Sequence, residues 1–173
     1  AVGSDTVGDV SVVADGDPLA QEPPAALIDL RDDRLSFAGL LDANGITDRP
    51  RLAGVQDKTS AAMISLPVRR MGERFILKLT PPEYSHLVEN EHHFLTWSRR
   101  CRIPTASARL IHDSTGAAGL LVRRFDRPEA LGTAGALHVE DACQALDRWP
   151  ADKYNVTFEE VSQRLMALST APA

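Results

Sequence analysis

A lysine and a glutamate occupy positions where the surrounding sequence is apolar. Lys78 interrupts the strand-like stretch FILKLTP at residues 75–81. Glu91 falls in a helical pattern, on the face that also carries Leu87, Phe94, Leu95 and Ser98. A carboxylate buried alone costs several kcal/mol and therefore needs a partner. Because the strand before this helix should pack against it, we predict an ion pair between Lys78 and Glu91. A solvent-facing lysine and a glutamate that reaches water are the alternative.

Such a pair suggests chemistry on phosphates. Protein kinases hold the α- and β-phosphates of ATP with a strand lysine that is paired to a glutamate of the following helix. Upstream, the segment LAGVQDKT offers a glycine loop. Gly54 lets the backbone approach a ligand, while Gln56 and Lys58 present polar and cationic groups to phosphate oxygens. A single glycine is more often only a turn, but its place one hairpin before the lysine strand favours a loop that covers a nucleotide.

A third segment, LLVRRFDRPE, has the form of a kinase hinge. An apolar strand ends here in Arg123, Arg124 and Phe125, and an Asp-Arg-Pro turn follows. Backbone groups at such a strand end can bind the edge of an adenine while apolar side chains enclose the ring. The alternative is an edge strand that ends at an ordinary turn.

The elements that must position these residues follow one another in a simple order. Two strands joined at Met71-Gly72 precede a helix that starts at the Pro-Pro-Glu segment 81–83 and stops before Pro104. A second hairpin turns at residues 113–116, and two helices close the chain. The first of these carries Val139, Ala142, Cys143 and Leu146 on one face, and the second starts at a Thr157–Glu160 capping box. This order predicts an α+β fold with an antiparallel sheet.

The first 48 residues have a weaker pattern. A strand is expected at residues 10–13, and a patchy helical pattern covers residues 26–45 and ends at Asn44-Gly45. We interpret residues 1–48 as a lead-in segment that is too poor in apolar pattern to form a domain of its own.

Composition limits the classes of function. The chain has 173 residues with 43% hydrophobic and 25% charged residues, which is typical of a soluble globular protein. A net charge of −5 disfavours broad nucleic-acid binding. No apolar run is long enough to span a bilayer and no signal peptide is present, so we predict a cytoplasmic protein without membrane contact. The two cysteines, Cys101 and Cys143, are expected to be reduced thiols in the core.

Three other groups of residues have simpler explanations. The histidines His86, His92 and His93 lack a metal-ligand spacing and are expected on a solvated helix face. A basic cluster (Arg99, Arg100, Arg102 and Arg109) fits the C-terminal end of a helix dipole, although contact with a partner stays open. Glu140 and Asp141 complement the dipole at the start of a helix.

Taken in series, these segments resemble the HipA family, the serine/threonine kinases of bacterial toxin–antitoxin systems. The resemblance rests on LAGVQDKTS, FILKL, ENEHHFLTW, IPTA, LVRRFDR, VEDACQAL and KYN, in that order, and RFDR followed by the Glu-Asp pair and Gln144 is the most characteristic combination. The opening VGSDTVGDVSVV is similar to the end of the family's N-terminal subdomain. Seven modest motifs in one order make the resemblance specific, and it covers nearly the whole chain.

The resemblance implies roles for the residues singled out above. Residues 54–58, with Gly54, Val55, Gln56 and Lys58, would form the loop over the nucleotide. Lys78 would be the ATP-phosphate lysine with Glu91 as its helix partner, and Arg123, Arg124 and Phe125 would belong to the adenine hinge. ATP and Mg²⁺ are the implied cofactors. The implied partners are a protein substrate and a helix-turn-helix antitoxin.

Two departures limit what the resemblance implies. Family members commonly carry an autophosphorylated serine before the glycine loop, and Arg51 stands at that position here. The Asp and Asn residues that orient the substrate and hold Mg²⁺ are also missing, because Asn44, Asn90 and Asn155 lie in other contexts. We therefore expect a fragment that carries the nucleotide-binding half and is inactive by itself, with the metal ligands beyond its end.

The sequence thus predicts three parts: a lead-in at residues 1–48, a protein-kinase-like N-lobe at 49–127, and the start of a helical C-lobe at 128–173. A non-enzymatic, kinase-derived module that binds an antitoxin-like regulator is one alternative. A small-molecule kinase of similar fold is the other.

Overall fold

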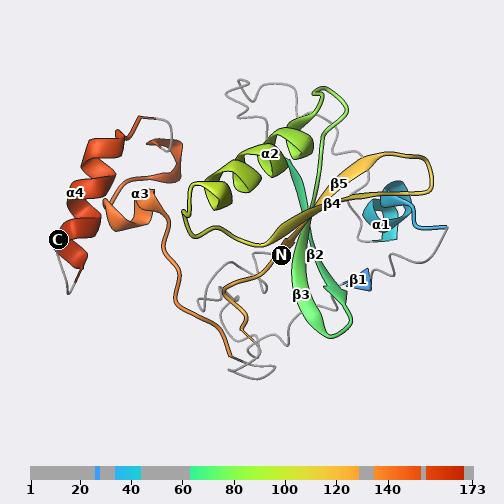
Figure 1. Cartoon of the computed structure of the whole chain (residues 1–173), viewed down its shortest axis with the longest axis horizontal. Coiled ribbons are helices and arrows are strands. Elements are labelled where there is room, and N and C mark those ends of the chain that lie inside the picture. The colour runs from blue at the N-terminus through green and yellow to red at the C-terminus, as the bar shows by residue number, and fades with distance from the viewer. Residues whose placement is uncertain (1–25, 28–33, 44–62, 129–134, 153–154, 170–173) are drawn as a thin grey trace, which may run out of the picture.

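A five-stranded sheet with one helix on each face forms the body of the protein (Figure 1). The computed structural model describes residues 26–27, 34–43, 63–128, 135–152 and 155–169. The elements are β1 (Ala26–Leu27), α1 (Phe37–Ala43), β2 (Ile64–Arg70), β3 (Glu73–Leu79), α2 (Leu87–Arg100), β4 (Ala108–His112), β5 (Ala118–Arg123), α3 (Ala142–Ala145), a 3-10 turn (Pro150–Asp152) and α4 (Phe158–Leu168). The described part of the chain is therefore α+β, with the antiparallel sheet and packed helix of a kinase-like N-lobe, as predicted.

The strand order in the sheet is β1-β2-β3-β5-β4. The four strands β2 to β5 are antiparallel to their neighbours, and the two-residue strand β1 joins β2 in parallel. The predicted hairpins are both present. At the first turn, Met71 and Gly72 have φ angles of 50° and 84°, and positive φ at both positions is the geometry of a type I′ turn, which matches the twist of the flanking strands.

One face of the sheet carries the main core. Leu66, Val68, Phe75, Leu77, Leu79, Ile111 and Leu121 are buried there together with Phe37 of α1. Alternation along β3 explains the pattern, because Phe75, Leu77 and Leu79 point to this face while Ile76 and Lys78 point to the other. Part of the predicted lead-in, the helix α1, therefore packs on the sheet.

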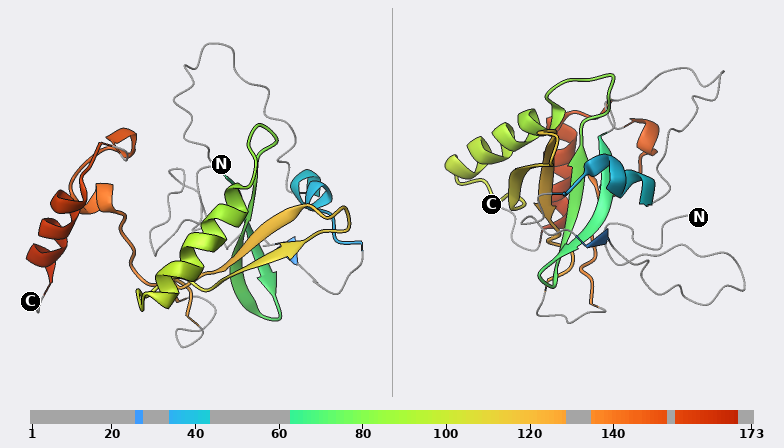
Figure 2. Two further views of the ribbon diagram at one scale, coloured as in Figure 1. Left: turned by 45° about the horizontal axis from the view of Figure 1, so that its top comes forward. Right: turned by 90° about the vertical axis from the view of Figure 1, so that its right-hand side faces the viewer.

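The opposite face of the sheet is covered by α2, which contacts β3, β4 and β5 (Figure 2). Val88 and Leu120 are fully buried there. The expected position of Phe94 in the buried stripe is wrong, since its side chain is 62% exposed. The buried stripe is narrower than predicted and starts at Val88, with Glu91, Leu95 and Ser98 half-buried along it.

The first turn of α2 also differs from the prediction. The helix begins at Leu87 rather than at Pro81–Glu83, because His86 adopts a left-handed conformation with φ of 59° that interrupts the helical backbone. The hydroxyl of Thr80 accepts a hydrogen bond from the Val88 N–H at 3.3 Å. It thereby satisfies one of the backbone donors that have no partner within the first turn of a helix. The predicted end before Pro104 is confirmed.

Of the smaller predictions, some are confirmed and others are wrong. Ala26 and Leu27, inside the segment predicted as helix, form β1. Cys143 is buried as expected, but Cys101 caps the C-terminus of α2 and is exposed. The expected strand at residues 10–13 lies outside the described residues.

The two last helices are capped by their own sequence. Thr157 and Glu160 form the predicted capping box of α4. Asp141 and Gln144 form a second one on α3, which has only four residues and is shorter than predicted. In Figure 1, α3 and α4 lie together, away from the sheet. Among the described residues no helix is both long and apolar enough to cross a membrane.

Candidate functional site

The predicted ion pair between β3 and α2 is present. The Nζ atom of Lys78 donates a hydrogen bond to Oε1 of Glu91 at 2.7 Å. The two side chains are 25% and 24% exposed, so the pair is partly withdrawn from water. At this depth the attraction between the charges is stronger than at an open surface, and the amine is held in one orientation.

The pair still has hydrogen-bonding capacity left. The ammonium of Lys78 has three donors, and only the bond to Glu91 uses one within the described part of the chain. The second carboxylate oxygen of Glu91, Oε2, is buried and receives no hydrogen bond from any described residue. A fixed cation with two remaining donors can bind the oxygens of a phosphate.

An apolar shelf lies beside the lysine on the same face of the sheet. Ile76 is two residues before Lys78 and stands directly opposite Val122 of β5, and both side chains are half-buried. Lys78 itself stands opposite Leu120. Sequence reasoning missed Ile76 and Val122, although the alternation of the strand already placed Ile76 on the face of Lys78.

The predicted hinge follows directly from the end of β5. The N–H of Arg123 donates to the carbonyl of Ser107 at 2.8 Å, and the N–H of Arg124 donates to the carbonyl of Arg74 at 3.0 Å. Both donors are therefore already used. Phe125 comes next, and its backbone has no hydrogen bond in the part of the chain that the structure describes. Of the three predicted hinge residues, only Phe125 thus offers its backbone N–H to a ligand.

A buried charge cluster anchors this hinge. The guanidinium of Arg124 donates to both carboxylate oxygens of Asp126, at 3.0 Å from Nε and 2.6 Å from Nη2. Arg127 adds a third hydrogen bond to Asp126 at 2.9 Å. The side chains of Arg124 and Asp126 are each only 3% exposed. A bidentate arginine–carboxylate pair fixes the orientation of both groups. The backbone at Phe125 therefore lies between two residues, Arg124 and Asp126, whose side chains are fixed.

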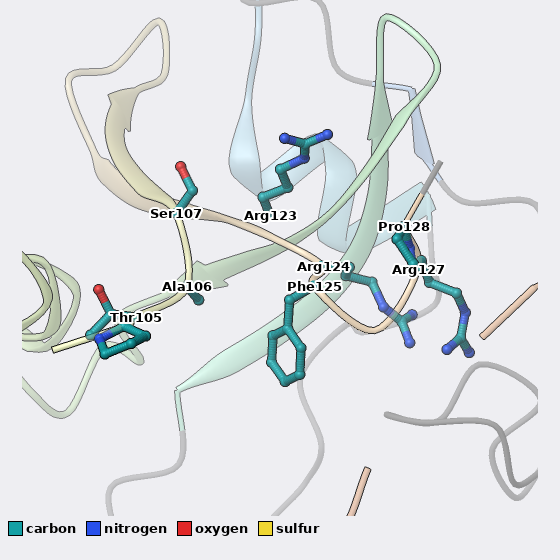
Figure 3. Close-up of a pocket in the computed structure, with 9 residues that line it drawn as sticks. Thr105, Ala106, Ser107, Arg123, Arg124, Phe125, Arg127 and Pro128 are labelled. Atoms are coloured by element: carbon teal, nitrogen blue, oxygen red, sulfur yellow. The ribbon is translucent and has the colours of Figure 1, made fainter. Parts of the chain in front are cut away.

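A pocket of about 610 Å³ opens beside the hinge, within the range usual for small-molecule sites. It is lined by the connector between α2 and β4 (Pro104, Thr105, Ala106 and Ser107) and by Arg123, Arg124, Phe125, Arg127 and Pro128. In Figure 3 the ring of Phe125 lies between Thr105 on one side and the guanidinium of Arg124 on the other. The hydroxyl of Thr105 is buried and has no hydrogen-bond partner among the described residues.

The pocket and the ion pair are separate features along β5. Neither Lys78 nor Glu91 lines the pocket. Leu120, the strand partner of Lys78, lies three residues before Arg123, a distance of about 10 Å along a strand. The predicted loop residues Gly54, Val55, Gln56 and Lys58 lie outside the described residues. No group of three His, Cys, Asp or Glu side chains in the described ranges could hold a metal ion.

Comparisons with known proteins show the family of this chain. The family model described as "HipA-like C-terminal domain" matches residues 51–173. Two proteins of Sinorhizobium fredii are similar: "Putative kinase Y4dM" is 28% identical over 99% of this chain and 42% of its own length, and "Putative kinase Y4mE" is 29% identical over 90% and 40%. This chain therefore spans about two fifths of these relatives. No solved structure gives a significant match.

Proposed function

Because the chain belongs to the family of HipA-like C-terminal domains, we propose that it is the nucleotide-binding lobe of an ATP-dependent serine/threonine protein kinase. In this proposal the parent protein transfers the γ-phosphate of ATP to a hydroxyl of a protein substrate. It acts as the toxin of a toxin–antitoxin pair and is neutralised by a helix-turn-helix antitoxin. The kinase character of the family supports the assignment as a kinase, and the names of the two relatives agree with it.

The observation that carries the proposal is the 2.7 Å contact between Lys78 and Glu91. A phosphate-binding lysine must be charged, oriented and partly shielded from water, and the glutamate of the adjoining helix supplies the orientation. The two donors of the lysine that no described residue uses would bind the α- and β-phosphates.

The adenine would lie at the hinge. The backbone of Phe125 supplies a donor for the base edge, and the apolar shelf of Ile76 and Val122 leads from the hinge toward Lys78. The distance of about 10 Å along β5 leaves room for the ribose between base and phosphates. Mg²⁺ would accompany ATP, and no group of side chains that could hold it is found in the described ranges. In this proposal the lobe binds and orients the nucleotide.

Nucleotide affinity tests the proposal. The binding of a fluorescent ATP analogue to the chain should weaken about 10- to 100-fold in Lys78→Ala, since hydrogen bonds to charged groups contribute about 1.5 to 3 kcal/mol. Glu91→Gln should weaken it less, because the lysine keeps its charge and loses only its orientation. Arg70→Ala, which removes a cation from the neighbouring strand β2, is the matched control and should bind like the unchanged chain. Equal affinity in Lys78→Ala and Arg70→Ala would reject the role of the lysine.

Phosphoryl transfer tests the finer part of the proposal. A chain extended to the length of its relatives should label itself or a protein substrate with phosphate from ATP, and Lys78→Ala should abolish the labelling. Labelling of sugars or aminoglycosides in place of protein would replace the protein-kinase assignment with a small-molecule kinase. ATP binding without any transfer would favour a regulatory module.

A further inference from the structure

The outer face of α2 exposes large apolar side chains that the nucleotide site does not use. Phe94 is 62% exposed and Trp97 is 49% exposed, while Ile103, just beyond the helix end, is 56% exposed. Single exposed apolar residues are ordinary, but neighbouring aromatic residues on one helix face are a mark of interaction sites. Glu91 is half-buried against the sheet, so this face is separate from the one that holds Lys78.

The exposed side chains form an ordered cluster. The ring of His93 stands edge-on to Phe94 at a centroid distance of 5.8 Å and lies 6.0 Å from Trp97. The guanidinium of Arg100 lies over the indole of Trp97, 5.3 Å from the ring centroid. These contacts hold aromatic and cationic groups in a fixed arrangement, which lowers the entropy lost on binding.

The segment that forms this cluster is rich in positive charge, and the nearest acidic side chain on the same helix face is Glu89, one turn before His93. Residues 92–112 include four arginines and no aspartate or glutamate, although the chain as a whole carries a net charge of −5. Arg100 and Arg102 are both exposed, whereas Arg99 donates a hydrogen bond to the carbonyl of Ala106. A local cationic surface on an acidic protein fits an acidic partner.

The end of α2 supplies a second, independent indication. The N–H of Ile103 bonds to the carbonyl of Ser98 and the N–H of Arg102 to that of Arg99, the bond pattern of a Schellman motif. Arg102 occupies its left-handed position with φ of 61°, where glycine is favoured because it avoids the steric cost. An arginine thus stands at a position where it weakens the helix end, and Schellman motifs are often accompanied by an apolar contact between the positions that Trp97 and Ile103 occupy here.

We propose that this surface, formed by His93, Phe94, Trp97, Arg100, Arg102 and Ile103, binds an acidic segment of a partner protein. An apolar side chain of the partner packs on Phe94 and Trp97, and its carboxylates pair with Arg100 and Arg102. Aromatic and arginine residues are the side chains most often central to protein interfaces. This proposal is independent of the nucleotide site.

A nucleic acid fits the same surface less well. Base stacking needs free aromatic faces, and Arg100 already covers one of the two faces of Trp97. Few phosphates could be neutralised by two free arginines, and the net charge of the chain repels the rest of the strand.

The test measures fluorescence polarisation of a labelled synthetic peptide with glutamates along one helical face and leucine and phenylalanine along the other. We expect Phe94→Ser and Arg100→Glu each to weaken its binding to the full chain about tenfold or more. The controls are Met71→Ser, which removes an even more exposed apolar residue elsewhere, and Arg70→Glu, which makes the same charge change on β2. Both controls should bind like the unchanged chain.

Arg102→Gly separates binding from folding. Glycine suits the left-handed position, so this variant should melt at the same or a higher temperature while it binds the peptide more weakly. A version of the peptide with glutamine in place of glutamate should bind at least tenfold more weakly than the acidic one.

Three results would overturn the proposal: no difference between the surface variants and the controls, equal binding of the glutamine peptide, or tighter binding of oligothymidine than of the acidic peptide. A fourth concerns the parent protein. If Trp97, observed in a Trp149→Phe background, is shielded from acrylamide in a chain extended to the length of its relatives, the surface is covered internally and binds no partner.

Discussion

Phe37 lies directly over Gly119, so that a β-carbon at position 119 would come within 2.9 Å of the ring atom Cζ of Phe37. The helix α1 is thus fitted to a strand more than seventy residues away along the chain. Asp113, in the β4–β5 turn, also binds α1: its Oδ2 atom accepts a hydrogen bond from the Phe37 N–H at 3.0 Å. The helix α1 is therefore part of the folding unit of the sheet.

Gly119→Ala should destabilise the protein by about 1 to 3 kcal/mol, because the added methyl group would push Phe37 and Leu77 out of a filled core. The matched control is Gly39→Ala on α1, where the new β-carbon meets only Ser36 at an ordinary 3.6 Å. That variant should be more stable by up to about 1 kcal/mol, since alanine favours the helix. Urea denaturation compares the two, and equal stabilities would contradict the close contact between Phe37 and Gly119.

Asp113 should make stability depend on acid. Partial burial would raise the pKa of its carboxyl, but hydrogen bonds from the Thr115 hydroxyl and from the N–H groups of Phe37, Thr115 and Ala117 outweigh this and lower the pKa below the ordinary 3.8. The stabilisation is therefore complete above pH 3.8 and is lost as the pH falls below that value. In Asp113→Asn the urea midpoint should be lower than in the unchanged chain at pH 6, and the gap should shrink toward pH 3. A difference in urea midpoint that stays constant between pH 6 and pH 3 would show that the Asp113 carboxylate does not cause the acid dependence.

Met71→Asn should stabilise the first hairpin. Met71 is 83% exposed and has a positive φ of 50°, a conformation that asparagine tolerates better than methionine does. Asn-Gly is the favoured sequence for a type I′ turn. We expect a gain of roughly 0.5 to 1 kcal/mol in the free energy of unfolding, whereas Gly72→Ala should be destabilising because Gly72 has a φ of 84°. A loss of stability in Met71→Asn would argue against the turn geometry.

Asp126→Asn should be among the most destabilising polar substitutions. The change would remove the carboxylate charge that pairs with the buried guanidinium of Arg124, and breaking a buried ion pair from one side costs about 3 to 5 kcal/mol. Glu73→Gln is the control, because it breaks the exposed pair between Glu73 and Arg123, which should cost at most about 1 kcal/mol. Chemical denaturation gives both values. Similar small losses in the two variants would mean that the cluster does not anchor the hinge.

The parts of the fold with strong local signals were predictable. Met71-Gly72 and residues 113–116 interrupt alternating strands, and turn residues at such positions fix a hairpin almost alone. The ion pair of Lys78 and Glu91 followed from a different rule, since a carboxylate in an apolar stripe requires a cation on the neighbouring element. The structure confirms that contact, while the role of the lysine in nucleotide binding stays a prediction.

The remaining features depend on contacts that a sequence pattern does not contain. The strand β1 has only two residues and no period to detect. Val88 and Phe94 lie about 120° apart around the helix, and packing on the sheet decides which of the two sides is buried. The late start of α2 depends on the backbone of His86, and the pairing of Arg124 with Asp126 depends on burial at the end of β5.

The position of β4 at one border of the sheet has a consequence for self-association. Such a strand presents a row of unpaired amide and carbonyl groups on its outer side, and chains can add to it as they do in aggregates. Arg109 and His112 are exposed on this strand. Their bulk and the charge of the arginine oppose the pairing of a second strand at this border.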